Sequence, residues 1–175
     1  MLRSPAPRRR SRWPRLAALS LAAGMLAIPP GVAAEWAVRP EPPAAGAPAV
    51  APAGCVMESE RQSLPDGYQK TWAQIIVDGK AVRVTSASQL DPGDGDIGLV
   101  VDDGAFVPMD EVVDGRTAVF RSRYESLVEE FRRGLKARVQ LRFWPTWPKT
   151  STHSATFSLI GFTRTHARLA DCRTP

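Results

Sequence analysis

The feature that most constrains the fold is a pair of predicted strands around a loop rich in proline and tryptophan, within residues 138–162. Apolar and polar side chains alternate over Arg138–Trp144. The apolar members are Val139, Leu141 and Phe143. A period of two residues is typical of a strand with one buried face. A second strand is predicted over Phe157–Ile160, with Phe157 and Leu159 on one side. The chain must therefore accommodate two strands joined by an irregular loop.

The loop between these strands and the end of the first strand carry the residues that we consider for binding. Pro145 and Pro148 cannot donate to a strand ladder, so the loop is expected to be irregular and stiff. The candidate binding residues are Arg142, Trp144, Trp147 and His153. The two tryptophans could stack on sugar rings, with Arg142 and His153 adding polar contacts. In the alternative interpretation both tryptophans cover the edge of the core, because large aromatic side chains are mostly buried.

The first 34 residues have the order of a secretory signal peptide. Six arginines between residues 3 and 15 precede the apolar run Leu16–Ile28, and the small residues Val32–Ala34 precede Glu35. This order predicts export and cleavage before Glu35. The alternative is an uncleaved membrane anchor. However, a membrane-spanning helix needs about 20 apolar residues, and the run Leu16–Ile28 is shorter than that. We therefore predict a protein of the periplasm or outer envelope, with no membrane span after cleavage.

The basic charge of the chain belongs to this leader. Six of the 23 Lys and Arg residues lie before Glu35, and none of the 18 Asp and Glu residues do. The remaining chain is therefore nearly neutral. It lacks the basic patch expected of a nucleic-acid-binding protein, so no nucleic-acid partner is predicted.

A proline- and alanine-rich segment over residues 35–54 is predicted to be an extended tether. Residues 55–175 then form a single globular β-rich domain. Cys55 and Cys172 are the two cysteines of the chain. In an oxidising compartment they predict a disulfide, and closing a loop of about 100 residues is worth roughly 4.7 kcal/mol in the chain-entropy model. One alternative is lipidation of Cys55. The other is a redox-active cysteine pair, which is disfavoured because the two cysteines do not have Cys-x-x-Cys spacing.

A β-hairpin is predicted in the first half of the domain. Trp72–Val77 and Lys80–Thr85 flank Asp78–Gly79, a dipeptide typical of two-residue turns. In that register Ala73 faces Val84, and Ile75 faces Val82. A turn-rich acidic loop over Asp91–Gly98 follows. Its aspartates could bind calcium, but their spacing is not that of an EF-hand, so we interpret the segment as a plain loop.

Short strands over Ile97–Val101, Phe106–Val113 and Thr117–Phe120 are predicted to form a meander. Apolar residues then recur at helical spacing: Tyr124, Leu127, Val128, Phe131 and Leu135. Ser122 and Glu125 predict a capping box at the start of this helix, and Gly134 its end. A short helix is expected after Gly161. The predicted fold is α+β, with an antiparallel, sandwich-like β core, one amphipathic helix and a short C-terminal helix.

No catalytic, metal or cofactor site is predicted. His153 lies near Ser151 and Ser154, and a hydrolase using this histidine and a serine is one hypothesis. However, a nucleophilic serine needs an orienting group and an oxyanion hole, and the G-x-S-x-G elbow is missing. A non-enzymatic role is therefore preferred.

The segment Phe157–Thr163, which contains Ser-Leu-Ile-Gly-Phe and precedes the short helix, resembles the closing motif of the invasion-associated locus B family. The order of Trp36 followed by Cys55–Met57 is also similar. Pro40 stands near a position where that family often has another cysteine, and the family's cysteine in the strands before the helix is also missing. The resemblance implies an exported bacterial envelope protein with a small β-rich domain and no known catalytic centre.

These observations lead to three functional hypotheses. The first is an exported, non-enzymatic cell-envelope protein that binds a protein or an envelope polymer, as the resemblance implies. The second is a glycan- or cell-wall-binding module that uses the Trp-Pro loop. The third is the hydrolase with His153.

Overall fold

The structure is a computed structural model that describes residues 36–41, 54–93, 95–145 and 151–172. The predicted signal peptide, residues 42–53 of the predicted tether, and Trp147 lie outside the described residues.

Two antiparallel sheets form the β core. The larger sheet consists, in spatial order, of β1 (Trp36–Pro40), β2 (Cys55–Ser59), β4 (Lys70–Val77), β5 (Val82–Ser86), β9 (Thr117–Phe120) and β8 (Glu111–Val113), and β3 (Gln62–Pro65) also pairs with β4. The smaller sheet consists of β11 (His153–Ser158), β10 (Lys136–Leu141), β6 (Gly98–Val101) and β7 (Val107–Pro108). The helices are α1 (Tyr124–Arg133) and α2 (Phe162–Asp171). The predicted α+β, sandwich-like fold is confirmed.

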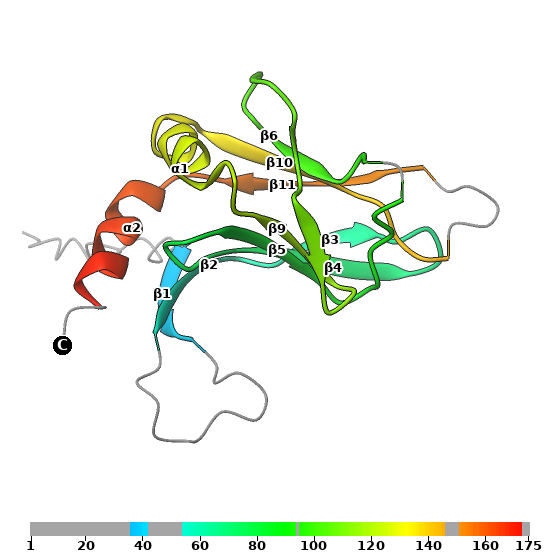
Figure 1. Cartoon of the computed structure of the whole chain (residues 1–175), viewed down its shortest axis with the longest axis horizontal. Helices are drawn as coiled ribbons and strands as arrows, with labels where there is room; N and C mark the ends of the chain where they lie inside the picture. Colours follow the sequence, from blue (N-terminus) through cyan, green and yellow to red (C-terminus); the bar gives the residue numbers. More distant parts are fainter. Residues whose placement is uncertain (1–35, 42–53, 94, 146–150, 173–175) are drawn as a thin grey trace, which may run out of the picture. The chain divides into compact units, whose positions relative to one another are not determined.

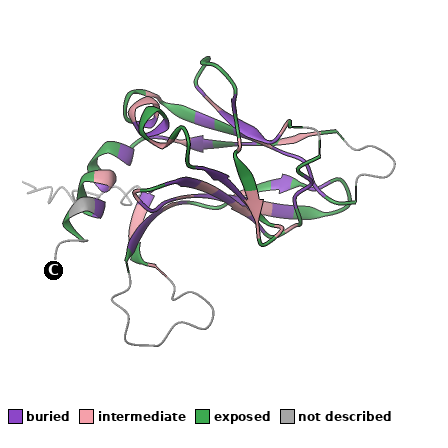
Figure 2. Ribbon diagram, in the orientation of Figure 1, coloured by how far each residue is buried: buried purple, intermediate pink, exposed green. Residues whose placement is uncertain are grey.

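The two sheets lie one above the other, with α1 and α2 together at one end of the pair (Figure 1). Buried residues follow the strands of both sheets, whereas the loop between β6 and β7 is exposed (Figure 2). At the helical end, the ring of Phe162 from α2 meets Trp36 and Phe131 edge-on, at centroid distances of 5.1 and 5.2 Å. This aromatic cluster joins both helices to the larger sheet.

Strand β1 corrects the predicted boundary between tether and domain. Residues Trp36–Pro40, assigned to the tether from their composition, pair with β2 along its whole length. Trp36 is 2% exposed, and its indole Nε1 donates a hydrogen bond to the Ser158 carbonyl at 2.9 Å. Burial of this large side chain stabilises the strand despite the proline-rich context. The β-rich domain therefore includes Trp36–Pro40, which the prediction had assigned to the tether.

The hairpin between β4 and β5 exists, but its predicted register is wrong. Val77 pairs with Val82, so the turn spans Asp78–Ala81 instead of two residues. The pairs are consequently Ala73 with Ser86 and Ile75 with Val84. The Asp78 carboxylate accepts hydrogen bonds from the backbone N–H groups of Lys80 and Ala81, both at 2.8 Å. An aspartate that bonds its own following backbone favours this wider turn.

The predicted meander is divided between the two sheets. β7 pairs with β6 in the smaller sheet, whereas β8 pairs with β9 in the larger one. The segment predicted as one strand over Phe106–Val113 therefore breaks at Met109 and Asp110, where the chain crosses from one sheet to the other. Each part follows its own partner strand, which the local sequence pattern does not specify.

Both predicted helices are present, and Gly134 is the C-cap of α1 as predicted, but the start of α1 differs. Arg123 is the N-cap of α1 and makes no side-chain capping bond, so the predicted capping box is wrong. The Ser122 hydroxyl instead donates to the Asp110 carboxylate. Helix α1 ends at Arg133, and Leu135 is 66% exposed, outside the core. Helix α2 follows Gly161, whose φ of 86° permits the sharp entry.

Candidate functional site

The candidate site lies where the ladder between β4 and its neighbours β2 and β3 changes register. Glu58 pairs with Ile76, but Gln62 pairs with Ala73. Three residues, Ser59–Arg61, therefore stand opposite only two, which is a β-bulge. Bulges redirect side chains and are common beside binding and active sites.

Side chains replace the ladder bonds that the bulge interrupts. The Ser59 hydroxyl accepts a hydrogen bond from the Ile75 backbone N–H at 3.0 Å and donates to the Glu60 carbonyl at 2.9 Å. Gln74 Nε2 donates to the Ser59 carbonyl at 2.8 Å. Ser59 is buried. The bulge is therefore held by buried hydrogen bonds, which makes it a fixed part of the sheet.

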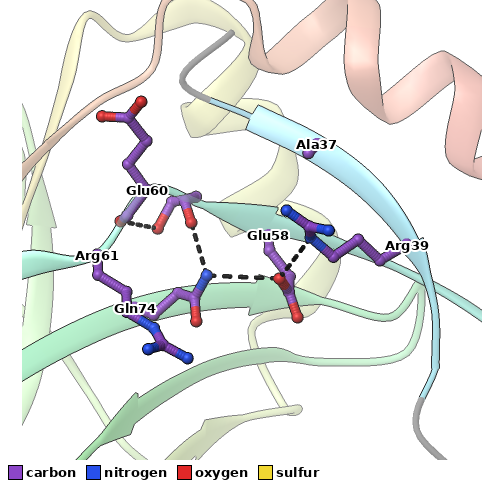
Figure 3. Close-up of a pocket in the computed structure, with 7 residues that line it drawn as sticks. Ala37, Arg39, Glu58, Glu60, Arg61 and Gln74 are labelled. Atoms are coloured by element: carbon purple, nitrogen blue, oxygen red, sulfur yellow. Dashed lines mark hydrogen bonds and ion pairs between the residues drawn. The ribbon is translucent and has the colours of Figure 1, made fainter. Parts of the chain in front are cut away.

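A pocket of about 640 Å³ lies over this bulge, on the face of the larger sheet that points away from the core. It is lined by Ala37, Arg39, Glu58, Ser59, Glu60, Arg61 and Gln74. Figure 3 shows Arg39 reaching Glu58 from β1, with Gln74 between Glu58 and Arg61. The volume lies within the roughly 300–1,000 Å³ of typical ligand pockets. We call this site the outer-face pocket.

Opposite charges line the outer-face pocket. Arg39 Nε lies 3.2 Å from Glu58 Oε2, and Gln74 Nε2 lies 3.5 Å from the same oxygen. On the other side, Arg61 Cζ lies 4.0 Å from the ring centroid of Trp72. A guanidinium above an indole is attracted by the negative face of the ring. The pocket thus combines hydrogen-bond donors and acceptors on rigid strands.

Sequence reasoning missed this site. A signal was present: the charged run Glu58–Arg61 interrupts the alternation expected of one continuous strand through β2 and β3. Pairing partners decide whether such an interruption becomes a turn or a bulge. The pocket also needs Ala37 and Arg39 of β1, a strand that composition alone assigned to the tether.

Arg142, predicted to bind a ligand, is buried and paired with an aspartate. It is 6% exposed, and its Nε lies 3.0 and 3.1 Å from the two carboxylate oxygens of Asp96. Its Nη2 also contacts the same carboxylate. The aspartate comes from the acidic loop that precedes β6. This buried ion pair leaves Arg142 little room to contact a ligand.

Trp144 and His153 lie at the opposite ends of the predicted binding loop. Trp144 is 51% exposed, and its backbone N–H donates to the Gln89 carbonyl at 3.0 Å. His153, expected in the loop, is the first residue of β11 and pairs with Leu141. Its ring lies 6.0 Å from that of Phe143, centroid to centroid. The structure therefore brings neither residue together with Arg142 into one described pocket, and Trp147 lies outside the described residues.

No preformed serine–histidine pair exists among the described residues. Ser154 is the neighbour of His153 in β11, and successive side chains of a strand point to opposite faces. No hydrogen bond joins His153 to Ser151 or Ser154, which are both described. Within the same part of the chain, no group of three or more His, Cys, Asp and Glu residues is arranged to hold a metal ion.

The predicted disulfide joins Cys55 of β2 to Cys172, directly after α2. Their Cα atoms are 6.1 Å apart across 117 residues of sequence. Because this bond uses the Cys55 sulfur, it is incompatible with a lipid thioether at the same atom. Within the described ranges, no helix has the length and apolar character needed to cross a bilayer.

No protein-family model matches the sequence. No curated protein matches it significantly. A crystal structure of invasion-associated protein B from Bartonella henselae is similar over 79% of this chain and 93% of that chain, with 16% identity and a TM-score of 0.49. A likeness at this level does not establish a shared family or function.

Proposed function

We propose that this protein is an exported cell-envelope domain that binds an envelope polymer or protein without catalysing a reaction. The disulfide between Cys55 and Cys172 is the observation that carries the export part of the proposal. Disulfides persist in oxidising compartments such as the periplasm and are rare in the cytosol. The signal peptide predicted over residues 1–34 supports the same compartment.

The binding part of the proposal is supported by the outer-face pocket. Its side chains project from paired strands and from a hydrogen-bonded bulge, so little ordering is required when a ligand binds. Preorganised polar groups on rigid elements are typical of binding sites. The family resemblance of the Ser-Leu-x-Gly-Phe ending remains a prediction that is consistent with this role.

The proposal is tested by intact mass spectrometry of the exported protein, followed by co-sedimentation with isolated envelope. We expect a chain that begins at Glu35, with two thiols that react with iodoacetamide only after reduction. We also expect the oxidised protein to sediment with isolated cell wall or outer membrane. An unprocessed chain with free thiols would refute export. A processed protein that remains in the supernatant would refute envelope binding.

A second candidate is glycan binding at the Trp-Pro loop, which the 51% exposure of Trp144 favours. Exposed aromatic faces can stack on sugar rings. If this candidate is correct, Trp144→Ala abolishes co-sedimentation with cell-wall fragments, and the intrinsic fluorescence of the wild-type protein changes when fragments are added. A Trp144→Ala protein that sediments like the wild type would remove the candidate.

A further inference from the structure

The outer-face pocket contains hydrogen-bonding groups that the described part of the protein does not use. Arg61 is the main donor. Its guanidinium lies over Trp72, and its N–H groups donate no hydrogen bond to the described residues. Stacking uses the face of the guanidinium and leaves its edges available. Such an edge matches the two oxygens of a carboxylate.

Gln74 supplies an acceptor on the floor of the pocket. It is 9% exposed, and its Nε2 points at two acceptors, the Ser59 carbonyl and the Glu58 carboxylate. This arrangement fixes the orientation of the amide, because only the nitrogen can donate. The amide oxygen Oε1 then accepts no hydrogen bond from the described residues. Because Gln74 lines the pocket, this oxygen is available to accept from a donor group of a ligand.

Arg39 and Glu58 supply the remaining hydrogen-bonding groups of the outer-face pocket that we consider. Arg39 contacts Glu58 through Nε, which leaves its terminal nitrogens without a partner among the described residues. The Glu58 carboxylate is shared between Arg39 and Gln74 and can accept further hydrogen bonds. Apart from the Glu60 carboxylate, which also lines it, the pocket therefore offers two cationic donors beside two acceptors. A neutral apolar ligand would pair with none of these groups, and a simple inorganic anion would leave the two acceptors without a partner.

We propose that the outer-face pocket binds a carboxylate-bearing saccharide unit. The carboxylate accepts from the edge of Arg61, while the sugar hydroxyls donate to Gln74 and Glu58 and accept from Arg39. A hydroxyl group both donates and accepts, so it suits the mixed character of this wall. The inference rests on the proposed envelope-binding function and specifies the chemistry of its ligand.

The position of the pocket favours a saccharide over a peptide. A peptide that extends a sheet needs unpaired backbone groups at a strand edge. The outer-face pocket instead lies on the face of the sheet, over β2 and β4, and both strands are paired on either side. Recognition must therefore come from side chains. Planar polar side chains from strands can recognise sugar hydroxyls without backbone pairing.

The test is an NMR titration of the full exported protein, with its disulfide intact and with ¹⁵N labelling. The probes are a disaccharide containing glucuronic acid, its methyl ester, neutral diacetylchitobiose and the peptide Ala-Ala-Ala. We expect the acid to shift the signals of Ala37, Glu58, Arg61 and Gln74. We expect the ester to bind at least about tenfold more weakly, because it cannot form the charged pair with Arg61.

Two variants and one control assign the effect to the pocket. Arg61→Gln should weaken binding of the acid at least tenfold and remove the difference between acid and ester. Ala37→Trp should block the pocket without altering a charge. The control Arg138→Gln removes an exposed arginine from β10 in the other sheet and should bind like the wild type.

Several results would overturn the inference. They are equal binding of acid and ester, unchanged binding by Arg61→Gln, selective binding of Ala-Ala-Ala in the pocket, and absence of binding by any probe. If the protein still sediments with the envelope in these cases, the proposed function survives and only the ligand class fails. If sedimentation also fails, both proposals are wrong.

Discussion

Strand β1 contributes side chains to two different regions, the aromatic cluster of the core and the outer-face pocket. On its core side, Trp36 packs edge-on against Phe162 of α2 and is almost fully buried. On its opposite side, Ala37 and Arg39 line the outer-face pocket. Alternation along a single strand thus places the aromatic cluster and the polar pocket back to back. We therefore expect substitutions on the core side of β1 to change stability, and substitutions on the pocket side to change binding.

The largest effect is expected for Trp36→Ala. Removing this side chain leaves a cavity beside Phe162 and breaks the bond to the Ser158 carbonyl, so the free energy of unfolding should fall by about 3–5 kcal/mol. Equilibrium urea denaturation measures the change. The matched control is Trp144→Ala, an exposed tryptophan, for which a change of at most about 0.5 kcal/mol is expected. Similar losses for the two variants would contradict the assignment of Trp36 to the core.

The disulfide should have the next largest effect. Replacing both cysteines, Cys55→Ser with Cys172→Ser, removes the link between β2 and the end of α2, and the expected loss is about 2–5 kcal/mol. The measurement is the urea midpoint with and without dithiothreitol. The reductant should lower the midpoint of the wild type to that of the double variant, and leave the double variant unchanged. A wild-type midpoint that is insensitive to reduction would show that the bond does not stabilise the domain.

Local patterns in the sequence predicted the core side of the molecule better than the pocket side. Period-two alternation identified Val139, Leu141 and Phe143 as buried, and all three are. Helical spacing and the glycines at 134 and 161 similarly identified both helices. These features depend on neighbours within one element, so the sequence is sufficient to find them.

The failures concern contacts between distant segments. The pairing of β1 with β2, the bulge opposite Gln74 and the buried pair of Arg142 with Asp96 depend on partners far along the chain. Nothing in the local pattern around Arg142 distinguishes a ligand-binding arginine from one neutralised by a loop aspartate. Long-range pairing therefore determines the surroundings of Arg142 and forms the outer-face pocket, and composition indicates neither.

A buried polar network around Asp66, in the turn between β3 and β4, provides a third test. Asp66 is buried, and its carboxylate accepts from the Ser88 hydroxyl at 2.7 Å and from the backbone N–H groups of Gln69 and Tyr68 at 2.8 and 2.9 Å. Burial raises the pKa of Asp66. The hydrogen bonds together lower this pKa by more than burial raises it, so the pKa of Asp66 lies below its usual value. A lowered folded-state pKa means that this stabilisation is present above the unfolded value of about 3.9 and is lost as the pH falls through the folded value.

Ser88→Ala should therefore reduce the free energy of unfolding by about 1–3 kcal/mol near neutral pH. The difference from the wild type should shrink once Asp66 is protonated, well below about pH 4. Urea denaturation across this range measures both effects. Ser154→Ala, an exposed serine of β11, is the control and should remain close to the wild type throughout. A Ser88→Ala loss that is independent of pH would mean that the hydroxyl does not act through the carboxylate.

The smallest change in stability is expected from the outer-face pocket. Arg61→Gln removes one exposed contact with Trp72, which is worth at most about 1 kcal/mol. Arg39→Gln removes an exposed ion pair worth about 0–1 kcal/mol. Urea denaturation should therefore place both variants near Arg138→Gln, the control from the other sheet. Their polar groups contribute little to folding, so a loss of envelope binding in these variants could be attributed to the pocket itself. If either variant instead unfolds as readily as Ser88→Ala, the pocket is part of the stabilising framework, and the two faces of β1 do not divide stability from binding.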